Sequence, residues 1–111
     1  MSEEHETDGW SCLERRGDGH LYVAGRDTVD LARRYGTPLY VMDEEMFVQR
    51  ARSFQEAWKR RGNDEVAYAG KAFLSTGMAR LVARMGLALD VVSGGELETA
   101  LRAGLGLHCA R

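Results

Sequence analysis

The fold is decided by residues 66–96, which read VAYAGKAFLSTGMARLVARMGLALDVVSGGE. The stretch begins with a short run of strand-forming residues, Val66–Ala69, and ends with a mostly apolar run, Leu87–Val92. Between the runs, apolar residues recur at helical spacing after a candidate N-cap at Ser75 or Thr76 and before a stop at Gly86: Met78, Leu81, Val82 and Met85. Strand, helix and strand in this order predict a parallel pair joined by a right-handed crossover.

A last helix is expected after the second run. Ser93 and the pair Gly94-Gly95 lead into a segment that ends near Gly104 and has apolar residues at Leu97, Ala100 and Leu101. Because Leu87–Val92 is apolar along nearly its whole length, we expect a strand buried on both faces, as in a parallel sheet. The fold class is therefore α/β.

Upstream, two short apolar-containing runs between Trp10 and Val23 flank Gly17-Asp18-Gly19 and predict a β-hairpin. Asp27 or Thr28 then caps an expected helix that Gly36 closes. The helix carries an inward stripe of Val29, Ala32 and Tyr35. Leu39–Met42 follows as a predicted short strand.

A longer helix is predicted from Asp43, a good N-cap, to Gly62. Its apolar stripe consists of Phe47, Ala51, Phe54 and Trp58, and its aromatic residues are interpreted as core. Residues 1–9 are polar and charged without periodicity, which is typical of a disordered tail.

Composition describes a soluble globular protein of one domain. The chain has 111 residues, a net charge of −2, 44% hydrophobic and 29% charged residues. Its most basic run, residues 59–61, falls at a predicted helix end and favours no nucleic acid partner. We expect no membrane partner either, because no apolar run approaches a spanning length and the acidic N-terminus is unlike a signal peptide.

Cysteine and histidine usage predicts neither a disulfide framework nor a metal site. Cys12 and Cys109 are far apart and show no ligand spacing, which favours a reducing compartment and, by default, the cytoplasm. His20 and His108 have no partners at ligand spacing, so both are interpreted as structural or surface residues.

Lys71 is the first candidate for chemistry, because reactive groups in α/β folds gather where parallel strands end. A lysine just past a strand is a candidate nucleophile toward a carbonyl group. We expect shielding from water by Tyr68, Ala69 and Phe73. The alternative is an ordinary solvated lysine.

Asp90 and Glu96 accompany the end of the second strand. A carboxylate in an apolar strand needs a cation or donors, and Lys71 is one candidate partner for Asp90. If the alternation is shifted by one residue, Asp90 faces solvent instead. Glu96, in the first helical turn, is equally explained as a partner of the helix dipole, and Gly94-Gly95 as plain chain reversal rather than a ligand-binding loop.

Three blocks of sequence add a resemblance to this reading. Residues 35–41, 66–73 and 90–97 read YGTPLYV, VAYAGKAF and DVVSGGEL. In this order and spacing they resemble the opening third of the diaminopimelate decarboxylases, a group of fold-type III pyridoxal-phosphate enzymes. The similarity runs from about Gly25 to Gly104. Ornithine, arginine and carboxynorspermidine decarboxylases and alanine racemase are the alternatives.

The resemblance implies a (β/α)8 TIM barrel of the alanine racemase-like type, present in part, joined to a second β domain. Residues 10–26 would belong to the β domain and residues 27–111 to the barrel. Lys71 matches the lysine that carries pyridoxal 5'-phosphate, and Asp90 and Glu96 match acidic positions near this cofactor. The implied reaction converts meso-2,6-diaminopimelate to L-lysine and CO2, a carboxy-lyase activity, in an enzyme that is a homodimer.

The chain departs from this pattern in length. A complete barrel needs ~250 residues, and residues 106–111 do not read as a third barrel strand. No counterpart is present for the glycine-rich phosphate loop, for the carboxylate that pairs with the pyridine nitrogen or for the substrate residues of the partner subunit. We therefore predict an N-terminal fragment that is inactive alone and that aggregates or pairs with another chain. A non-catalytic module that binds pyridoxal phosphate is the alternative.

Overall fold

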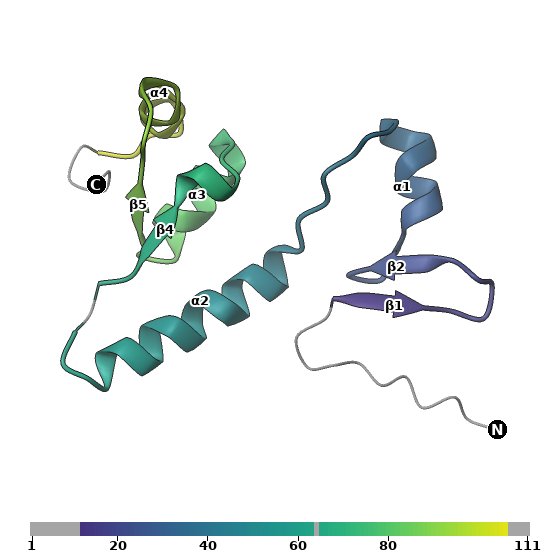
Figure 1. Cartoon of the computed structure of the whole chain (residues 1–111), viewed down its shortest axis with the longest axis horizontal. Helices are drawn as coiled ribbons and strands as arrows, with labels where there is room; N and C mark the ends of the chain where they lie inside the picture. The colour runs from purple at the N-terminus through teal and green to yellow at the C-terminus, as the bar shows by residue number, and fades with distance from the viewer. Residues whose placement is uncertain (1–11, 64, 107–111) are drawn as a thin grey trace. The chain divides into compact units, whose positions relative to one another are not determined.

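The structure is a computed structural model that describes residues 12–63 and 65–106. Within it the chain divides into two compact units, with the boundary between Phe47 and Val48. Figure 1 shows the course of the chain through its helices and strands. The predicted tail at residues 1–9, as well as His108 and Cys109, lies outside the described residues.

The first unit contains a small antiparallel sheet followed by a helix. Its strands are β1 (Leu13–Arg15), β2 (Leu21–Val23) and β3 (Arg26–Asp27), in the order β1-β2-β3. Leu13 pairs with Val23 and Arg15 with Leu21, which confirms the predicted hairpin within the described residues (Figure 1). The third strand was not predicted, because two residues are too few to show a periodic pattern.

The helix of the first unit, α1 (Thr28–Tyr35), begins and ends where the sequence predicts. Asp27 is the N-cap, and its Oδ1 accepts a hydrogen bond from Val29 N at 2.9 Å. Gly36, with φ of 80°, follows the last turn. The predicted inward position of Tyr35 is wrong, because this residue is 61% exposed. Three strands of at most three residues have too little apolar surface to bury the whole stripe.

The predicted strand at Leu39–Met42 is also wrong. In the described part of the chain this segment pairs with no strand, and all four residues are exposed, Tyr40 to 91%. A β-strand requires a neighbour for its backbone hydrogen bonds, and local sequence preference does not supply one.

The second unit holds the predicted strand-helix-strand-helix arrangement. In chain order it contains β4 (Ala67–Ala69), the 3₁₀ turn η1 (Gly70–Ala72), α3 (Thr76–Arg84), β5 (Ala88–Asp90) and α4 (Gly94–Arg102). The strands β4 and β5 are parallel, which confirms the expected pairing. Ser75 and Ser93 are the N-caps of the two helices, and their side chains accept hydrogen bonds from Met78 N and Glu96 N.

The core of the second unit forms between α3, β5 and α4. Val82, Leu89 and Ala100 are completely buried, and Met78 and Leu81 lie beside them at 8% exposure or less. The strand β5 is shorter than predicted, and the run predicted as a strand is not buried along its length, since Asp90 is exposed and Val92, beyond the strand, is 66% exposed.

The long helix α2 (Glu44–Lys59) starts as predicted, because Asp43 Oδ1 accepts a hydrogen bond from Met46 N at 3.1 Å. In the second unit, Gln55 Nε2 donates to Met85 O at 2.7 Å. Ala51 is buried, but Phe54 and Trp58 are 67% and 47% exposed, so the interpretation of these aromatics as core is wrong. Among the described residues, none of the helices has the length and hydrophobicity needed to cross a bilayer.

Candidate functional site

The candidate site lies at the edge where both strands of the parallel pair end. Ala69 and Asp90 are register partners and the last residues of β4 and β5. Lys71 follows two residues after Ala69, and Glu96 lies in the first turn of α4 after β5. The parallel register therefore brings Lys71, Asp90 and Glu96 to one edge of the sheet, as the sequence predicts.

Lys71 occupies the middle of η1 and is exposed. The predicted shielding of its amine by Tyr68, Ala69 and Phe73 is wrong in this structure. Instead, the Tyr68 hydroxyl donates a hydrogen bond to Phe73 O at 2.6 Å, across the turn that carries the lysine. An exposed primary amine in a fixed turn fits a ligand that presents an aldehyde, because the two groups condense when they meet.

Asp90 is exposed at the end of β5, next to the completely buried Leu89. Side chains alternate between the faces of a strand, so an inward Leu89 turns its neighbour outward. The expected pairing with Lys71 is absent, since no hydrogen bond or ion pair joins the side chains of these two described residues. The second reading of Asp90, a carboxylate that faces solvent, is the one observed.

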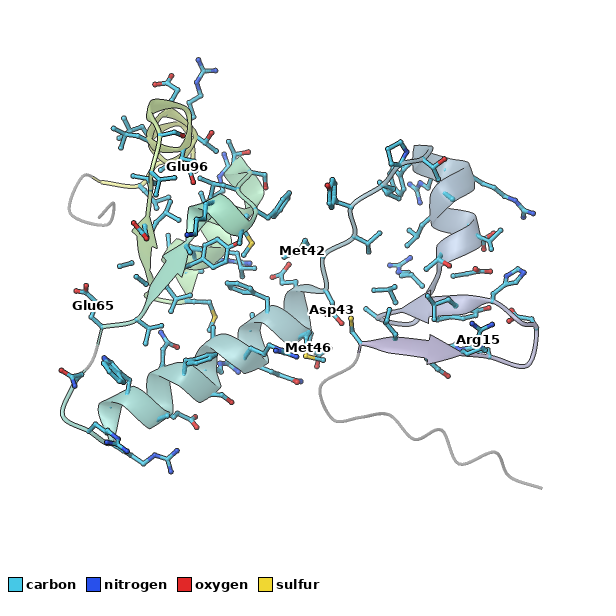
Figure 2. All side chains as sticks on the ribbon, in the orientation of Figure 1. Arg15, Met42, Asp43, Met46, Glu65 and Glu96 are labelled. Carbon is cyan, nitrogen blue, oxygen red and sulfur yellow. The ribbon has the colours of Figure 1, made fainter. Side chains whose placement is uncertain are left out.

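Glu96 fixes the loop between β5 and α4 (Figure 2). Its Oε2 accepts hydrogen bonds from Val92 N and from Ser93 Oγ, both at 3.0 Å, while Ser93 Oγ accepts from Glu96 N at 3.2 Å. This reciprocal arrangement is a variant of the capping box. The other carboxylate oxygen, Oε1, is buried without a hydrogen-bond partner among the described residues.

Gly70 brings η1, the turn that carries Lys71 and is called the lysine turn below, close to the end of β5. A Cβ at this position would lie 3.0 Å from Asp90 O and 3.1 Å from Glu96 Oε1. Gly70 is the first residue of η1 and is buried, and these short distances show that the turn begins close to both candidate acidic residues. The sequence reasoning did not single out Gly70, although a glycine directly before a candidate nucleophile was a visible signal.

The diglycine at the start of α4 leaves its backbone accessible. Gly94 and Gly95 are exposed, and no atom lies within 4 Å of the position that a Cβ of Gly94 would take. Ser93, the N-cap, uses its side chain for Glu96 N. The positive end of the α4 dipole thus lies open at the same edge as Lys71.

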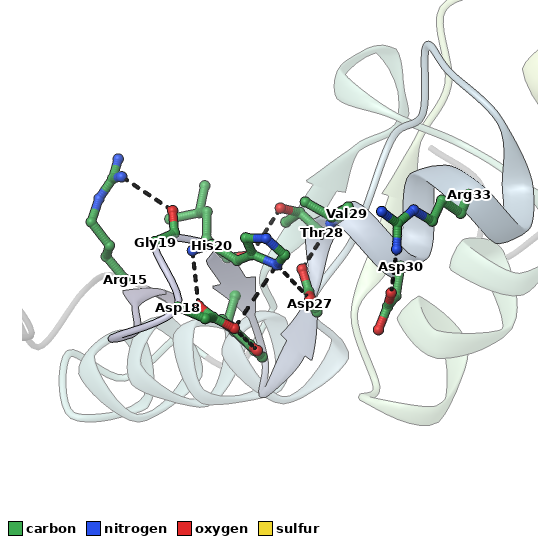
Figure 3. A network of polar contacts seen from close by, with 11 residues as sticks. Arg15, Asp18, Gly19, His20, Asp27, Thr28, Val29, Asp30 and Arg33 are labelled. Carbon is green, nitrogen blue, oxygen red and sulfur yellow. Dashed lines mark hydrogen bonds and ion pairs between the residues drawn. The ribbon is translucent and has the colours of Figure 1, made fainter.

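A second polar cluster, in the first unit, was missed. His20 Nδ1 lies 2.8 Å from Asp27 Oδ2 and 3.9 Å from Asp18 Oδ2 (Figure 3). The hydrogen bond with Asp27 raises the pKa of His20, and the bond with His20 lowers the pKa of Asp27. The ligand atoms of all three residues lie within 4.8 Å of one another. The prediction that His20 has no partners at ligand spacing was wrong, because Asp18 lies two residues before it and the fold brings Asp27, seven residues away, beside it.

Comparisons with known proteins point to one family. Residues 44–108 match the family described as pyridoxal-dependent decarboxylase, pyridoxal binding domain. The diaminopimelate decarboxylase of Bacillus methanolicus is 52% identical over 91 residues, and that of Bacillus subtilis is 53% identical over 87 residues. These matches cover 81% and 78% of this chain but only 21% and 20% of the relatives, so the chain spans about a fifth of their length.

A solved structure agrees with the sequence matches. The diaminopimelate decarboxylase from M. jannaschii superimposes with a TM-score of 0.73 at 36% identity, over 89% of this chain and 24% of that chain. The region matched to the family includes β4, η1, α3, β5 and α4, and therefore the whole candidate site. The chain accordingly belongs to the pyridoxal-dependent decarboxylase family, through the part that matches its pyridoxal-binding domain.

Proposed function

We propose that Lys71 carries pyridoxal 5'-phosphate through a covalent link at its amine. Three observations support this assignment: the residue lies at the carboxyl edge of a parallel strand pair, its side chain is exposed, and the matched family binds pyridoxal. The single observation on which the proposal depends is the position of Lys71 in η1, directly after β4 and beside the end of β5.

Asp90 and Glu96 are proposed to lie close to the bound cofactor. The exposed carboxylate of Asp90 can orient a cationic group or accept a proton at the edge of the sheet. Glu96 has a different role, because its Oε2 already accepts hydrogen bonds from Val92 N and Ser93 Oγ. It holds the β5–α4 loop in place next to Gly70.

The longer protein to which such a chain corresponds is proposed to be a diaminopimelate decarboxylase. That enzyme would release CO2 from meso-2,6-diaminopimelate and form L-lysine. The bound cofactor supplies an electron sink for the charge that remains when CO2 departs. The proposed architecture is a (β/α)8 barrel that begins near residue 27, with residues 10–26 in a β domain, in a cytoplasmic homodimer without nucleic acid or membrane partners.

The cofactor assignment can be tested directly, because the chain has only two lysines, Lys59 and Lys71. We would incubate the 111-residue chain with pyridoxal phosphate, reduce the mixture with borohydride and digest it. Mass spectrometry should then locate the reduced adduct on the peptide with Lys71. Lys71→Ala should abolish this adduct, and the matched control Lys59→Ala should leave it unchanged. An adduct of equal yield on both lysines would contradict the assignment.

A second candidate function is a module that holds pyridoxal phosphate without turnover. The observation in its favour is that residues 44–108, which include the candidate lysine, match a domain described as pyridoxal binding. Adduct formation at Lys71 together with an absence of CO2 release is the result that this candidate predicts for the chain alone.

A further inference from the structure

The lysine turn is closed by a side chain from the strand before it. Tyr68 lies in the middle of β4, and its hydroxyl donates to Phe73 O at 2.6 Å. The residues between the two partners comprise Ala69 and the whole of η1, with Lys71 at its centre. The hydrogen bond therefore converts the segment that carries the lysine into a closed loop.

Both ends of this loop belong to rigid elements. Tyr68 is the register partner of Leu89, which is completely buried. Beyond Phe73, Ser75 caps α3, and the first turn of this helix contains the buried Met78. The Tyr68 hydroxyl thus joins a strand to the start of the next helix, and the lysine lies on the connection between them.

The environment of Tyr68 keeps its hydroxyl a donor. Burial raises the pKa of this phenol. The protonated phenol is the form that donates to the Phe73 carbonyl. The O···O distance of 2.6 Å lies at the short end of the range for hydroxyl donors.

The opposite side of the turn is already fixed. Gly70 is buried, and its Cβ position lies 3.0 Å from Asp90 O and 3.1 Å from Glu96 Oε1. The remaining freedom of the turn is therefore at its far side, between Lys71 and Phe73. That side is the one that the Tyr68 hydroxyl closes.

We infer that Tyr68 is a positioning residue for Lys71, because its hydroxyl holds the lysine turn closed against the start of α3. This inference rests on the proposed role of Lys71 as the cofactor lysine. A preorganised amine attacks an aldehyde faster, because less conformational entropy is lost on the way to the transition state. In this arrangement the Tyr68 hydroxyl acts on the turn through Phe73 O.

The variant that tests the inference is Tyr68→Phe, which keeps the ring and removes only the hydroxyl. The matched control is Tyr22→Phe in the first unit, which also removes a tyrosine hydrogen bond, the one from Tyr22 to Asp18 Oδ2 at 2.7 Å. Two readouts are needed on the full chain. Amide hydrogen exchange follows the peptide that covers residues 70–74, and borohydride trapping follows the rate of adduct formation at saturating pyridoxal phosphate.

We expect Tyr68→Phe to accelerate exchange at residues 70–74 roughly two- to tenfold, the factor that corresponds to one ordinary hydrogen bond. The plateau rate of adduct formation at Lys71 should fall by a similar factor. Circular dichroism should stay unchanged, and Tyr22→Phe should alter neither readout. A merely structural role would leave the plateau rate of adduct formation unaffected.

The two proposals fail in distinguishable ways. If the unmodified chain forms no adduct at Lys71, the cofactor assignment fails, and the exchange data alone decide whether Tyr68 holds the turn. If the adduct forms at an equal rate in Tyr68→Phe and in the unmodified chain, the positioning role is overturned while the cofactor assignment stands. Equal exchange at residues 70–74 in both chains overturns the positioning role as well.

Discussion

Ala69 and Asp90 face each other as register partners at the ends of two parallel strands. One residue later on the first strand, Gly70 lies against the Asp90 carbonyl, and the next residue is Lys71. On the second strand the chain turns into the loop that Glu96 holds. The position of the candidate site therefore depends on the pairing of β4 with β5. A variant that disrupts this pairing should also alter the site.

Leu89 tests how much the strand pair depends on the core. Its side chain, on β5, is completely buried, so Leu89→Ala leaves a cavity and should lower the free energy of unfolding by about 2–5 kcal/mol. Urea denaturation followed by circular dichroism measures this loss. Leu101→Ala is the control, because Leu101 is 44% exposed and should cost about 0.5 kcal/mol or less. Equal losses in the two variants would show that the core lies elsewhere.

Glu96 should contribute through hydrogen bonds more than through charge. Glu96→Ala removes the acceptor of two hydrogen bonds at the start of α4 and should cost about 1–2 kcal/mol of unfolding free energy. Glu96→Gln keeps an acceptor oxygen and should retain most of the stability. Thermal denaturation of both variants distinguishes these roles. Glu98→Ala, which removes an exposed pair with Arg102 at 2.9 Å, should cost about 0.5 kcal/mol or less.

The His20–Asp27 pair should make the first unit sensitive to pH. The hydrogen bond with Asp27 raises the pKa of His20, so its contribution is complete below the ordinary value of 6.5 and is lost as pH rises through the raised value. The same bond lowers the pKa of Asp27, whose contribution is present above the ordinary value of 3.8 and is lost as pH falls through the lowered value. The pair therefore stabilises the unit between these limits.

Asp27→Asn isolates this effect, because asparagine is also a good N-cap for α1. NMR titration of His20 should give a midpoint nearer the ordinary value in this variant than in the unmodified chain. Asp30→Asn, at an exposed position in α1, is the control, and its midpoint should stay as high as in the unmodified chain. A midpoint that is equal in all three chains would refute the pairing in solution.

The 111-residue chain by itself should not catalyse decarboxylation. Active sites of α/β barrels, the architecture proposed here, are assembled from the loops after several strands, and the described residues contribute only the loops after β4 and β5. We expect no CO2 release from meso-2,6-diaminopimelate in the presence of pyridoxal phosphate, measured with carboxyl-labelled substrate. Release that depends on Lys71 would overturn this prediction.

Local signals in the sequence predicted the elements of the second unit well. The cap at Ser75, one of two candidates, and a helix end followed by Gly86 are determined by neighbouring residues, and the structure confirms both. The parallel pairing of β4 and β5 also followed from the order of the elements. The position of Lys71 after its strand was therefore predictable without knowledge of the fold.

Features that depend on distant partners were not predictable in the same way. Periodicity identified the apolar faces that contain Tyr35, Phe54 and Trp58, but these residues are exposed because nothing among the described residues covers them. The hydrogen bond from the Tyr68 hydroxyl to Phe73 O could not be predicted from the sequence either, because it depends on the path that η1 takes. An apolar stripe indicates which side can be buried, and packing decides whether it is.

The two-stranded sheet leaves backbone groups of both strands available for pairing with another chain. Among the described residues, β4 pairs only with β5, so each strand keeps one side whose amide and carbonyl groups have no ladder neighbour. Such sides recruit extended peptides, whether from another copy or from a deliberately supplied chain. A polypeptide corresponding to the remaining four fifths of a relative could be offered in trans, and recovered turnover would make this chain the smaller part of a split enzyme.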